Sequence, residues 1–201
     1  MAKRILNMTA EEMTHATKNE LIEAIAGSEG RVLASETIGI TIPLLTDVTN
    51  AEFAASMGAD LILLNMFDVQ EPKIMALPEV EKEETVREVK RLTGRMVGIN
   101  LEPVEESYAS DNKETLWEMS AGRYATVENA IQAQKMGVDL IVLTGNPGNG
   151  VSNPAIISSL KAISEAVGEK IMLAAGKMHA SGIIGEGGEN IITKEDIRQF
   201  A

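Results

Sequence analysis

Three acidic residues follow short apolar segments of the sequence: Glu36, Asp68 and Glu102. Oxygen ligands that converge from neighbouring strands suit Mg2+ or Mn2+, which prefer carboxylates and water. We therefore predict a divalent-metal site at these three residues. Glu36 or Glu102 could instead act as a general base. The simpler alternative for each residue is a solvated loop carboxylate.

The segment Gly145-Asn-Pro-Gly-Asn-Gly150 follows another apolar segment and precedes a predicted helix. Its glycines let backbone N–H groups approach a ligand closely, and a helix N-terminus favours an anion. We predict phosphate or carboxylate binding at Gly145, Asn146, Gly148 and Gly150, with a tight turn as the simpler alternative. No Gly-Lys-Ser/Thr follows, so the segment is not a nucleotide P-loop, and no nucleotide cofactor is expected.

Further polar residues stand at the ends of the same apolar segments. Asn65, Asn100 and Thr144 are predicted to form hydrogen bonds with a small hydrophilic substrate. Lys177 would neutralise a phosphate, act as a base or form a Schiff base, although a solvated charge is the simpler alternative. The catalytic candidates are therefore Glu36, Glu102 and Lys177.

Five apolar segments spaced along the chain are predicted to be parallel strands covered on both faces. They are 32–37, 60–65, 96–101, 139–144 and 170–175. A helical pattern occupies each gap, as in repeated βα units. Parallel strands of this kind place their carboxyl ends at one edge, which would bring the polar candidates together.

An internal repeat supports this organisation. Residues 50–64 and 129–143 share nine of fifteen positions at an offset of 79 residues. Each copy predicts a helix that ends at a glycine, followed by an aspartate that begins a strand.

Thr/Glu and Thr/Asp pairs predict helix starts by the capping-box pattern. The starting residues are Thr9, Thr17, Thr49 and Thr193, and Ser152 before Pro154 predicts another start. The first two helices would cover the bottom of a barrel. The last, 193–201, resembles the beginning of the repeat without its glycine and strand, so we expect a chain that lacks its C-terminal part.

Two α/β folds fit the pattern: an open doubly wound sheet and a (β/α)8 TIM barrel, which needs about 250 residues. The first predicted strand is followed by no Gly-x-Gly-x-x-Gly, and polar residues at every strand end are typical of a barrel mouth. We predict a single α/β domain of the barrel type, with a helical cap over 1–30 and about five βα units over 31–201. The doubly wound sheet is the alternative.

Four segments resemble an uncharacterised family of bacterial barrel proteins that are labelled phosphoenolpyruvate phosphonomutase-like, some of them haloacid dehalogenase-like. The segments are Glu36-Thr37, 64–68, 100–103 and 144–148. The resemblance covers almost the whole chain and implies a barrel that continues for about a hundred residues. If the protein is an enzyme, it implies a lyase or isomerase.

Composition excludes several classes of function. With 18 Lys and Arg against 30 Asp and Glu, the net charge is −12, which argues against a nucleic-acid surface. The absence of cysteine excludes disulfides and a cysteine nucleophile, and two histidines make a structural zinc site untenable. Neither a membrane-length apolar segment nor a signal-peptide core occurs, so a cytoplasmic protein is expected.

The sequence as a whole predicts a metabolic enzyme that acts on a small phosphorylated or carboxylated metabolite with the help of a divalent metal. The alternatives are a metabolite-binding or regulatory barrel without catalysis, and an inactive fragment of a longer enzyme. Because five barrel units leave two open sheet edges, we also expect a homo-oligomer.

Overall fold

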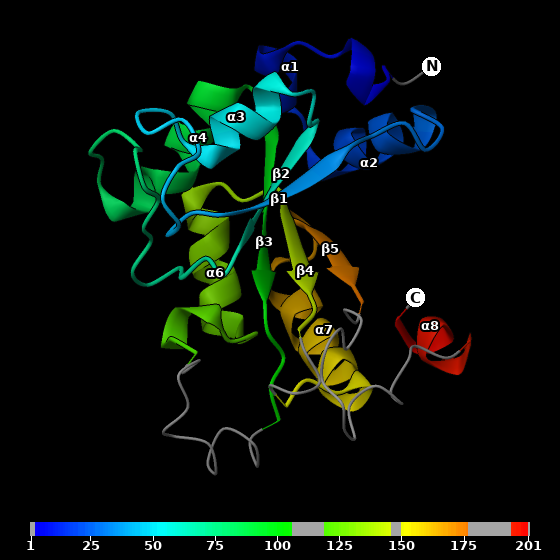
Figure 1. Cartoon of the computed structure of the whole chain (residues 1–201). Helices are drawn as coiled ribbons and strands as arrows, with labels where there is room; N and C mark the ends of the chain where they lie inside the picture. The colour runs from blue at the N-terminus through cyan, green and yellow to red at the C-terminus, as the bar shows by residue number, and fades with distance from the viewer. Residues whose placement is uncertain (1–2, 106–118, 146–149, 177–193, 201) are drawn as a thin grey trace.

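A computed structural model describes residues 3–105, 119–145, 150–176 and 194–200 (Figure 1). Its centre is one sheet of five parallel strands: β1 Ala34–Ile38, β2 Leu61–Asn65, β3 Met96–Leu101, β4 Leu140–Leu143 and β5 Met172–Ala175. The predicted strands are confirmed, and their ends differ from the prediction by no more than two residues.

The strands lie in the sheet in chain order, β1-β2-β3-β4-β5. A doubly wound sheet reverses this order at a switch point, and the ligand crevice forms there. The described strands show no reversal, so the sheet is α/β with the winding of successive barrel units, and the doubly wound alternative does not apply to it.

Four helices join the strands and cover one face of the sheet: α3 Asn50–Ser56, α4 Thr85–Thr93, α6 Val127–Met136 and α7 Asn153–Val167. The main core lies between them and the sheet. Its strand residues are Ile62, Leu64, Val97, Ile99, Leu101, Ile141 and Leu143. Because side chains alternate along a strand, the residues between these face the other side of the sheet, which the connecting helices leave open.

The N-terminal segment covers the amino ends of the strands. It consists of α1 Ala10–His15, α2 Lys18–Gly27 and a 3-10 turn over Ile5–Asn7. Their apolar residues form a second cluster with the first residues of β2, β3 and β5. In Figure 1 the arrowheads of β3, β4 and β5 point away from α1 and α2, so these helices lie at the amino ends of the strands, the place predicted for a cap.

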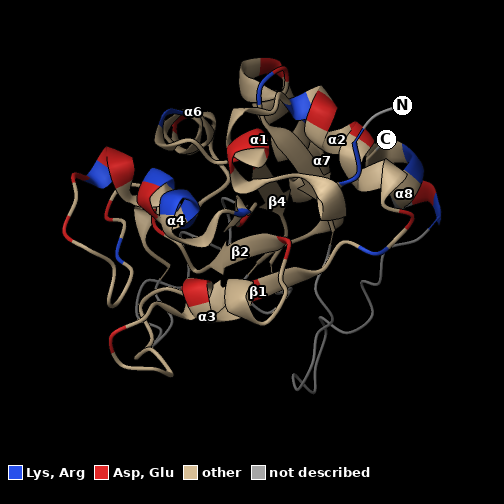
Figure 2. Cartoon of the chain, turned by 90° about the horizontal axis from the view of Figure 1, so that it is seen from above, with Lys and Arg blue, Asp and Glu red and all other residues tan. Residues whose placement is uncertain are grey.

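Three further elements complete the described chain. Two are 3-10 turns, over Lys82–Glu84 and Ala121–Arg123, and the third is α8 Lys194–Phe200, which contacts α7. Charged residues lie mainly on helices and loops, and α4 and α8 each carry both signs (Figure 2). Among the described residues, no helix combines the length and apolar character needed to cross a membrane.

One strand is less buried than the apolar pattern predicts. β3 is buried along its whole length, but β1 has only exposed or half-buried residues. The reason is its position, because none of the described strands pairs with its outer edge. The prediction of two covered faces was therefore wrong for β1.

The aspartates of the internal repeat join consecutive strands at their amino ends. The Asp60 backbone N–H donates to the Leu33 carbonyl at 2.8 Å, and the Asp60 carboxylate accepts the Leu33 N–H at 2.9 Å. Asp139 makes the same two bonds with Val97, both at 2.9 Å. Only the second copy adds a buried ion pair, between the Asp139 carboxylate and the Lys90 ammonium at 2.7 Å.

The asparagines of the repeat hold the loop that precedes each helix. The Asn50 side chain accepts the Leu44 N–H at 3.0 Å. The Asn129 amide donates to the carbonyls of Ala121 and Tyr124 at 2.8 and 2.9 Å. In addition to a helix with a glycine at its end, the repeat therefore supplies an asparagine that holds the preceding loop and an aspartate that joins two strands.

The predicted helix starts are confirmed wherever they can be seen. Complete capping boxes join Thr9 to Glu12, Thr17 to Glu20 and Thr49 to Glu52, and Ser152 caps α7 through the Ala155 N–H. Thr193 lies outside the described residues.

The first capping box predicts a pH-dependent helix start. A hydrogen bond from Lys3, followed by bonds from the Thr9 backbone and hydroxyl, lowers the pKa of Glu12 from 4.5 to about 2. A lowered carboxyl pKa stabilises the folded α1 above pH 4.5, and this stabilisation is lost as the pH falls through about 2. We expect the Glu12 side-chain carboxyl carbon to titrate near pH 2 in an NMR experiment, with amide protection in α1 falling over the same window.

Lys3→Met serves as the control for this titration. Because it removes the largest cause of the shift, the Glu12 midpoint should move toward 4.5. A wild-type midpoint that already lies at 4.5 would show that the Lys3 contact does not form in solution.

Candidate functional site

A row of polar side chains crosses the carboxyl ends of β1, β2 and β3. The Asn65 Nδ2 donates to the Glu36 carboxylate at 2.8 Å, and the Asn100 Nδ2 donates to the Asn65 Oδ1 at 3.1 Å. Asn65 and Asn100 follow the core residues Leu64 and Ile99, so both side chains lie on the face that the helices leave open. The structure thus brings together three of the residues predicted from the sequence.

The row has a fixed direction. An ionised Glu36 only accepts hydrogen bonds, so Asn65 must present its NH2 group to it. The Asn65 oxygen then faces Asn100, and Asn100 in turn must donate through its own NH2 group. The oxygen that remains, Asn100 Oδ1, is buried and has no hydrogen-bond partner among the described residues.

Backbone strain adjoins this row. Met66 directly follows Asn65 and has a left-handed backbone with φ of 57°, which is uncommon for a residue other than glycine. Its N–H donates to the Asn65 Oδ1 at 2.8 Å, which holds the Asn65 amide in the orientation that the row requires. Strain of this kind concentrates at functional sites.

A buried ion pair lies beside the row on β3. Glu102, two residues after Asn100, pairs with Arg123, and their side chains are 10% and 14% exposed. Thr144, which follows the neighbouring strand β4, is also buried. The sequence predicted Glu102 and Thr144 as site residues but did not single out Arg123.

Arg123 reaches the sheet because its segment runs alongside the end of β3. The Glu102 N–H donates to the Arg123 carbonyl at 2.9 Å, and the Ala125 N–H donates to the Glu102 carbonyl at 3.0 Å. Gly122, one residue earlier, has no space for a side chain, since a Cβ atom there would lie 1.8 Å from the Asp68 Oδ1. The Gly-Arg pair a few residues before the helix α6 was the only sequence signal for this position.

Asp68 holds a turn. Its Oδ1 accepts the N–H groups of Gln70 at 2.8 Å and Glu71 at 3.0 Å. Burial alone would raise the pKa of Asp68, but hydrogen bonds from the Ser120 side chain and from these two N–H groups outweigh it and hold the pKa below its usual value. Asp68 thereby positions the segment that carries Arg123.

The three predicted metal ligands do not form one cluster. Within the part of the chain that the structure describes, no three His, Cys, Asp or Glu side chains gather as a metal site. Glu36 belongs to the hydrogen-bonded row, Asp68 to its turn and Glu102 to its ion pair. A divalent cation at this end of the sheet stays a prediction.

The predicted anion loop is seen only at its two ends. A Cβ atom at Gly145 would lie 2.5 Å from the Val151 side chain and 3.4 Å from the Glu102 Oε2, so the loop begins against the ion pair. Gly150 has a φ of 80°, and its carbonyl accepts the Glu105 N–H at 3.0 Å. Asn146, Gly148 and Lys177 lie outside the described residues.

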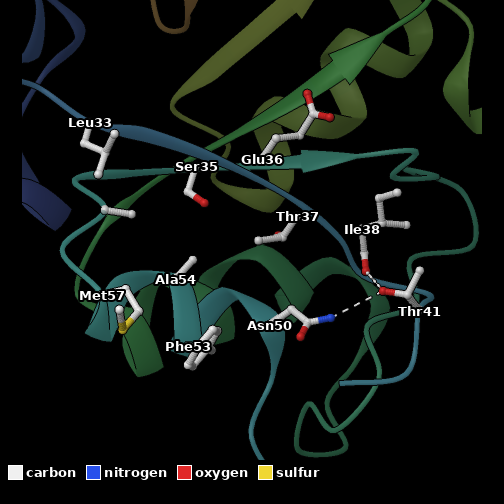
Figure 3. A pocket seen from close by; sticks show the side chains of 11 residues that line it. Leu33, Ser35, Glu36, Thr37, Ile38, Thr41, Asn50, Phe53, Ala54 and Met57 are labelled. Atoms are coloured by element: carbon white, nitrogen blue, oxygen red, sulfur yellow. Dashed lines mark hydrogen bonds between the residues drawn. The ribbon is translucent and has the colours of Figure 1, made fainter. Parts of the chain in front are cut away.

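A separate groove of about 490 Å3 lies between β1 and α3. Ser35 and Thr37 face α3, where Phe53 and Met57 line the groove, whereas the Glu36 side chain points to the opposite side of β1 (Figure 3). The groove and the polar row therefore lie on different faces of the sheet.

The fold is similar to that of 2,3-dimethylmalate lyase, which is described as a member of the PEP mutase/isocitrate lyase superfamily. The TM-score is 0.51 at 10% sequence identity, over 92% of this chain and 60% of the lyase chain. A xylose isomerase-like TIM barrel/4-hydroxyphenylpyruvate dioxygenase fusion protein gives a TM-score of 0.45 at 13% identity, over 83% of this chain and 24% of that protein. The lyase supports the barrel-type fold, and at this identity the likeness concerns the fold alone.

This chain spans only 60% of the length of the lyase. No curated protein sequence matches the chain. A family model described as "Domain of unknown function (DUF7916)" matches residues 6–201.

Proposed function

The chain belongs to the DUF7916 family, and we propose that it is a lyase- or isomerase-like metabolic enzyme whose site lies at the carboxyl ends of β1 to β4. Its substrate would be a small carboxylated or phosphorylated metabolite. The site lies at the carboxyl ends of the strands, where barrel enzymes carry out their chemistry. The malate derivative in the name of the lyase with a similar fold supports a test of carboxylated compounds first.

The buried Asn100 Oδ1 is the observation that carries this proposal. A buried acceptor without a donor costs about 1–3 kcal/mol. The Asn100 Oδ1 has no donor among the described residues, and the bonds that join Asn100 to Asn65 and Glu36 fix the orientation of its amide. A structural asparagine could satisfy both ends of its amide. An asparagine that presents a fixed, unpaired oxygen is suited to a ligand hydroxyl or a cation.

A divalent cation fits this oxygen. Asn100 on β3 and Glu102 just beyond its end would hold Mg2+ or Mn2+ through the Asn100 Oδ1 and the Glu102 oxygen that Arg123 does not bond, with water as the remaining ligands. When bound, the ion would supply positive charge that polarises a substrate oxygen. Asp68 is not proposed as a ligand, because its carboxylate already accepts two backbone N–H groups.

Glu36 is the proposed general base. Its side chain is exposed on the open face, and only one of its oxygens accepts a hydrogen bond from the described residues, that of Asn65. It would take a proton from a hydroxyl, or from a carbon next to a carboxylate, of the bound metabolite. The hydrogen bond from Asn65 holds one carboxylate oxygen in place and leaves the other for the ligand.

The proposal is tested with the purified chain, Mg2+ and a panel of 2-hydroxy acids, 2-oxo acids and small phosphate esters. We expect one class to raise the unfolding temperature and to be consumed in an NMR assay of the mixture. Ligand present at about 100 times its Kd would stabilise the fold by about 2.7 kcal/mol. Asn100→Leu should abolish this stabilisation, whereas Asn50→Leu, which alters a loop contact elsewhere, should retain the ligand-induced increment.

The outcomes separate the candidate functions. Stabilisation together with turnover supports the enzyme. Stabilisation without turnover of any compound would instead make the protein a metabolite-binding barrel, the alternative that the sequence left open. A panel without effect on either readout would contradict the proposed site.

A further inference from the structure

We propose that Arg123 binds the anionic group of the ligand, a carboxylate or a phosphate, and that Glu102 holds the guanidinium in position for it. This inference rests on the proposed function, since it assigns one part of the ligand to one side chain of the same site. Arg123 would give the site a cationic group. From the sequence, anion binding was predicted at the Gly145–Gly150 loop and at Lys177.

Several contacts hold the segment of Arg123 in place. The Val69 N–H donates to the Gly122 carbonyl at 3.2 Å, and the Asn129 amide fixes the carbonyls on both sides, those of Ala121 and Tyr124. The absent side chain of Gly122 lets the segment lie against Asp68. A connecting loop does not need so many attachments, but a preorganised binding residue does.

The Arg123 guanidinium has more donors than its described hydrogen bonds use. A guanidinium carries five N–H donors in a planar fork, and the described hydrogen bonds of this side chain use one of its nitrogens, on the Glu102 Oε1. The Nε and Nη1 atoms of Arg123 have no hydrogen-bond partner among the described residues. These donors can bind a carboxylate or phosphate in the bidentate manner that suits arginine.

The charge of the chain works against an anionic ligand. The chain carries a net charge of −12, and the exposed Glu36 at one end of the row repels an anion. The Glu102 Oε2 also stands 3.4 Å from the Cβ position of Gly145, at the start of the predicted anion loop. An anionic ligand therefore needs a local cation, and Arg123 is a nearly buried one at this place.

Glu102 and a ligand anion would compete for the same guanidinium. Removing the Glu102 charge should then favour the ligand, because Arg123 is released from its internal partner. A purely structural ion pair predicts the reverse: without Glu102 the arginine loses its position, and anion binding is unchanged or lost.

The experiment measures the affinity of the whole chain for two probes, oxalate and inorganic phosphate, by calorimetry without metal. We expect one or both to bind, and the ratio of the two affinities identifies the ligand as a carboxylate or a phosphate. Arg123→Lys, which keeps a positive charge, should weaken binding about tenfold or more, because lysine lacks the bidentate fork. Glu102→Gln should tighten binding by about tenfold, which corresponds to 1.4 kcal/mol.

Arg91→Gln is the matched control. Arg91 also pairs with a glutamate, Glu88, but on the exposed surface of α4, where its side chain is 65% exposed. This variant should bind both probes as the wild type does. A neutral residue at position 123 would leave Glu102 buried without a partner and could prevent folding. Arg123→Lys avoids this problem because it keeps the positive charge.

Two results would overturn the inference: no binding of either probe to the wild type, or equal affinities in wild type, Arg123→Lys and Glu102→Gln. Its failure is distinct from that of the proposed function. Turnover that is unchanged in Arg123→Lys removes the anion subsite and leaves the enzyme, whereas probe binding without turnover of any metabolite leaves the subsite and removes the enzyme.

Discussion

Replacing Asp139 by alanine should lower the free energy of unfolding by about 3–5 kcal/mol, measured by urea denaturation. The side chains of Lys90 and Asp139 are 10% and 11% exposed, and their ion pair is 2.7 Å long. Burial raises the pKa of Asp139, and Lys90 opposes this rise, so the carboxylate depends on its partner. Without Asp139, the Lys90 ammonium and the Val97 N–H would both lose a partner inside the protein.

The repeat supplies a control for this variant. Asp60 occupies the same place and accepts the N–H of Leu33 in the same way, but no cation pairs with it in the described structure. Asp60→Ala should therefore cost only about 1–3 kcal/mol, the loss of a hydrogen bond to a charged group. The double variant Lys90→Met, Asp139→Asn should recover most of the stability, because it leaves no buried charge. Equal losses at positions 60 and 139 would contradict the role of the ion pair.

Replacing Glu36 by glutamine should lower the turnover of the identified substrate about 100- to 10,000-fold, the usual contribution of a general base. Glutamine keeps the size of the side chain and an oxygen that can accept the Asn65 bond, but it cannot take a proton. Ligand affinity should stay within a few-fold of the wild-type value, and stability should be nearly unchanged because Glu36 is exposed.

Glu128→Gln is the control for this second variant, because Glu128 is an exposed carboxylate in the first turn of α6. It should retain wild-type turnover. A Glu36→Gln protein that turns over substrate at the wild-type rate would remove Glu36 from the chemistry and leave it a role in orienting Asn65.

Much of the fold could be predicted because short sequence patterns determine its strands and helix starts. The strands are short apolar runs, and the helix starts at Thr9, Thr17 and Thr49 follow from contacts within four residues. The repeat indicated successive βα units, and the sequential strand order agrees with it. The exposure of β1 could not be predicted, since an apolar pattern does not say whether a neighbour lies at the edge of the sheet.

The site could be predicted only where strand ends define it. Asn65, Asn100 and Glu102 lie together because parallel strands align their carboxyl ends. Arg123 could not be found, because it lies 21 residues beyond its partner and reaches it through a segment without periodic pattern. Asp68 was predicted as a metal ligand. Its true role in a turn could not be predicted, because its carboxylate accepts backbone N–H groups, which every residue type can supply.

The proposed function requires that the row of Glu36, Asn65 and Asn100 binds the ligand, and the side-chain amide signals of asparagine test this binding directly. In an NMR titration with Mg2+ and the stabilising metabolite, the NH2 signals of Asn65 and Asn100 should shift together and saturate. The NH2 signal of Asn50, which holds the 41–44 loop on the other side of the sheet, should not move. Shifts at Asn50 alone, or no shift at Asn65 and Asn100 while a metabolite is bound or consumed, would contradict the account.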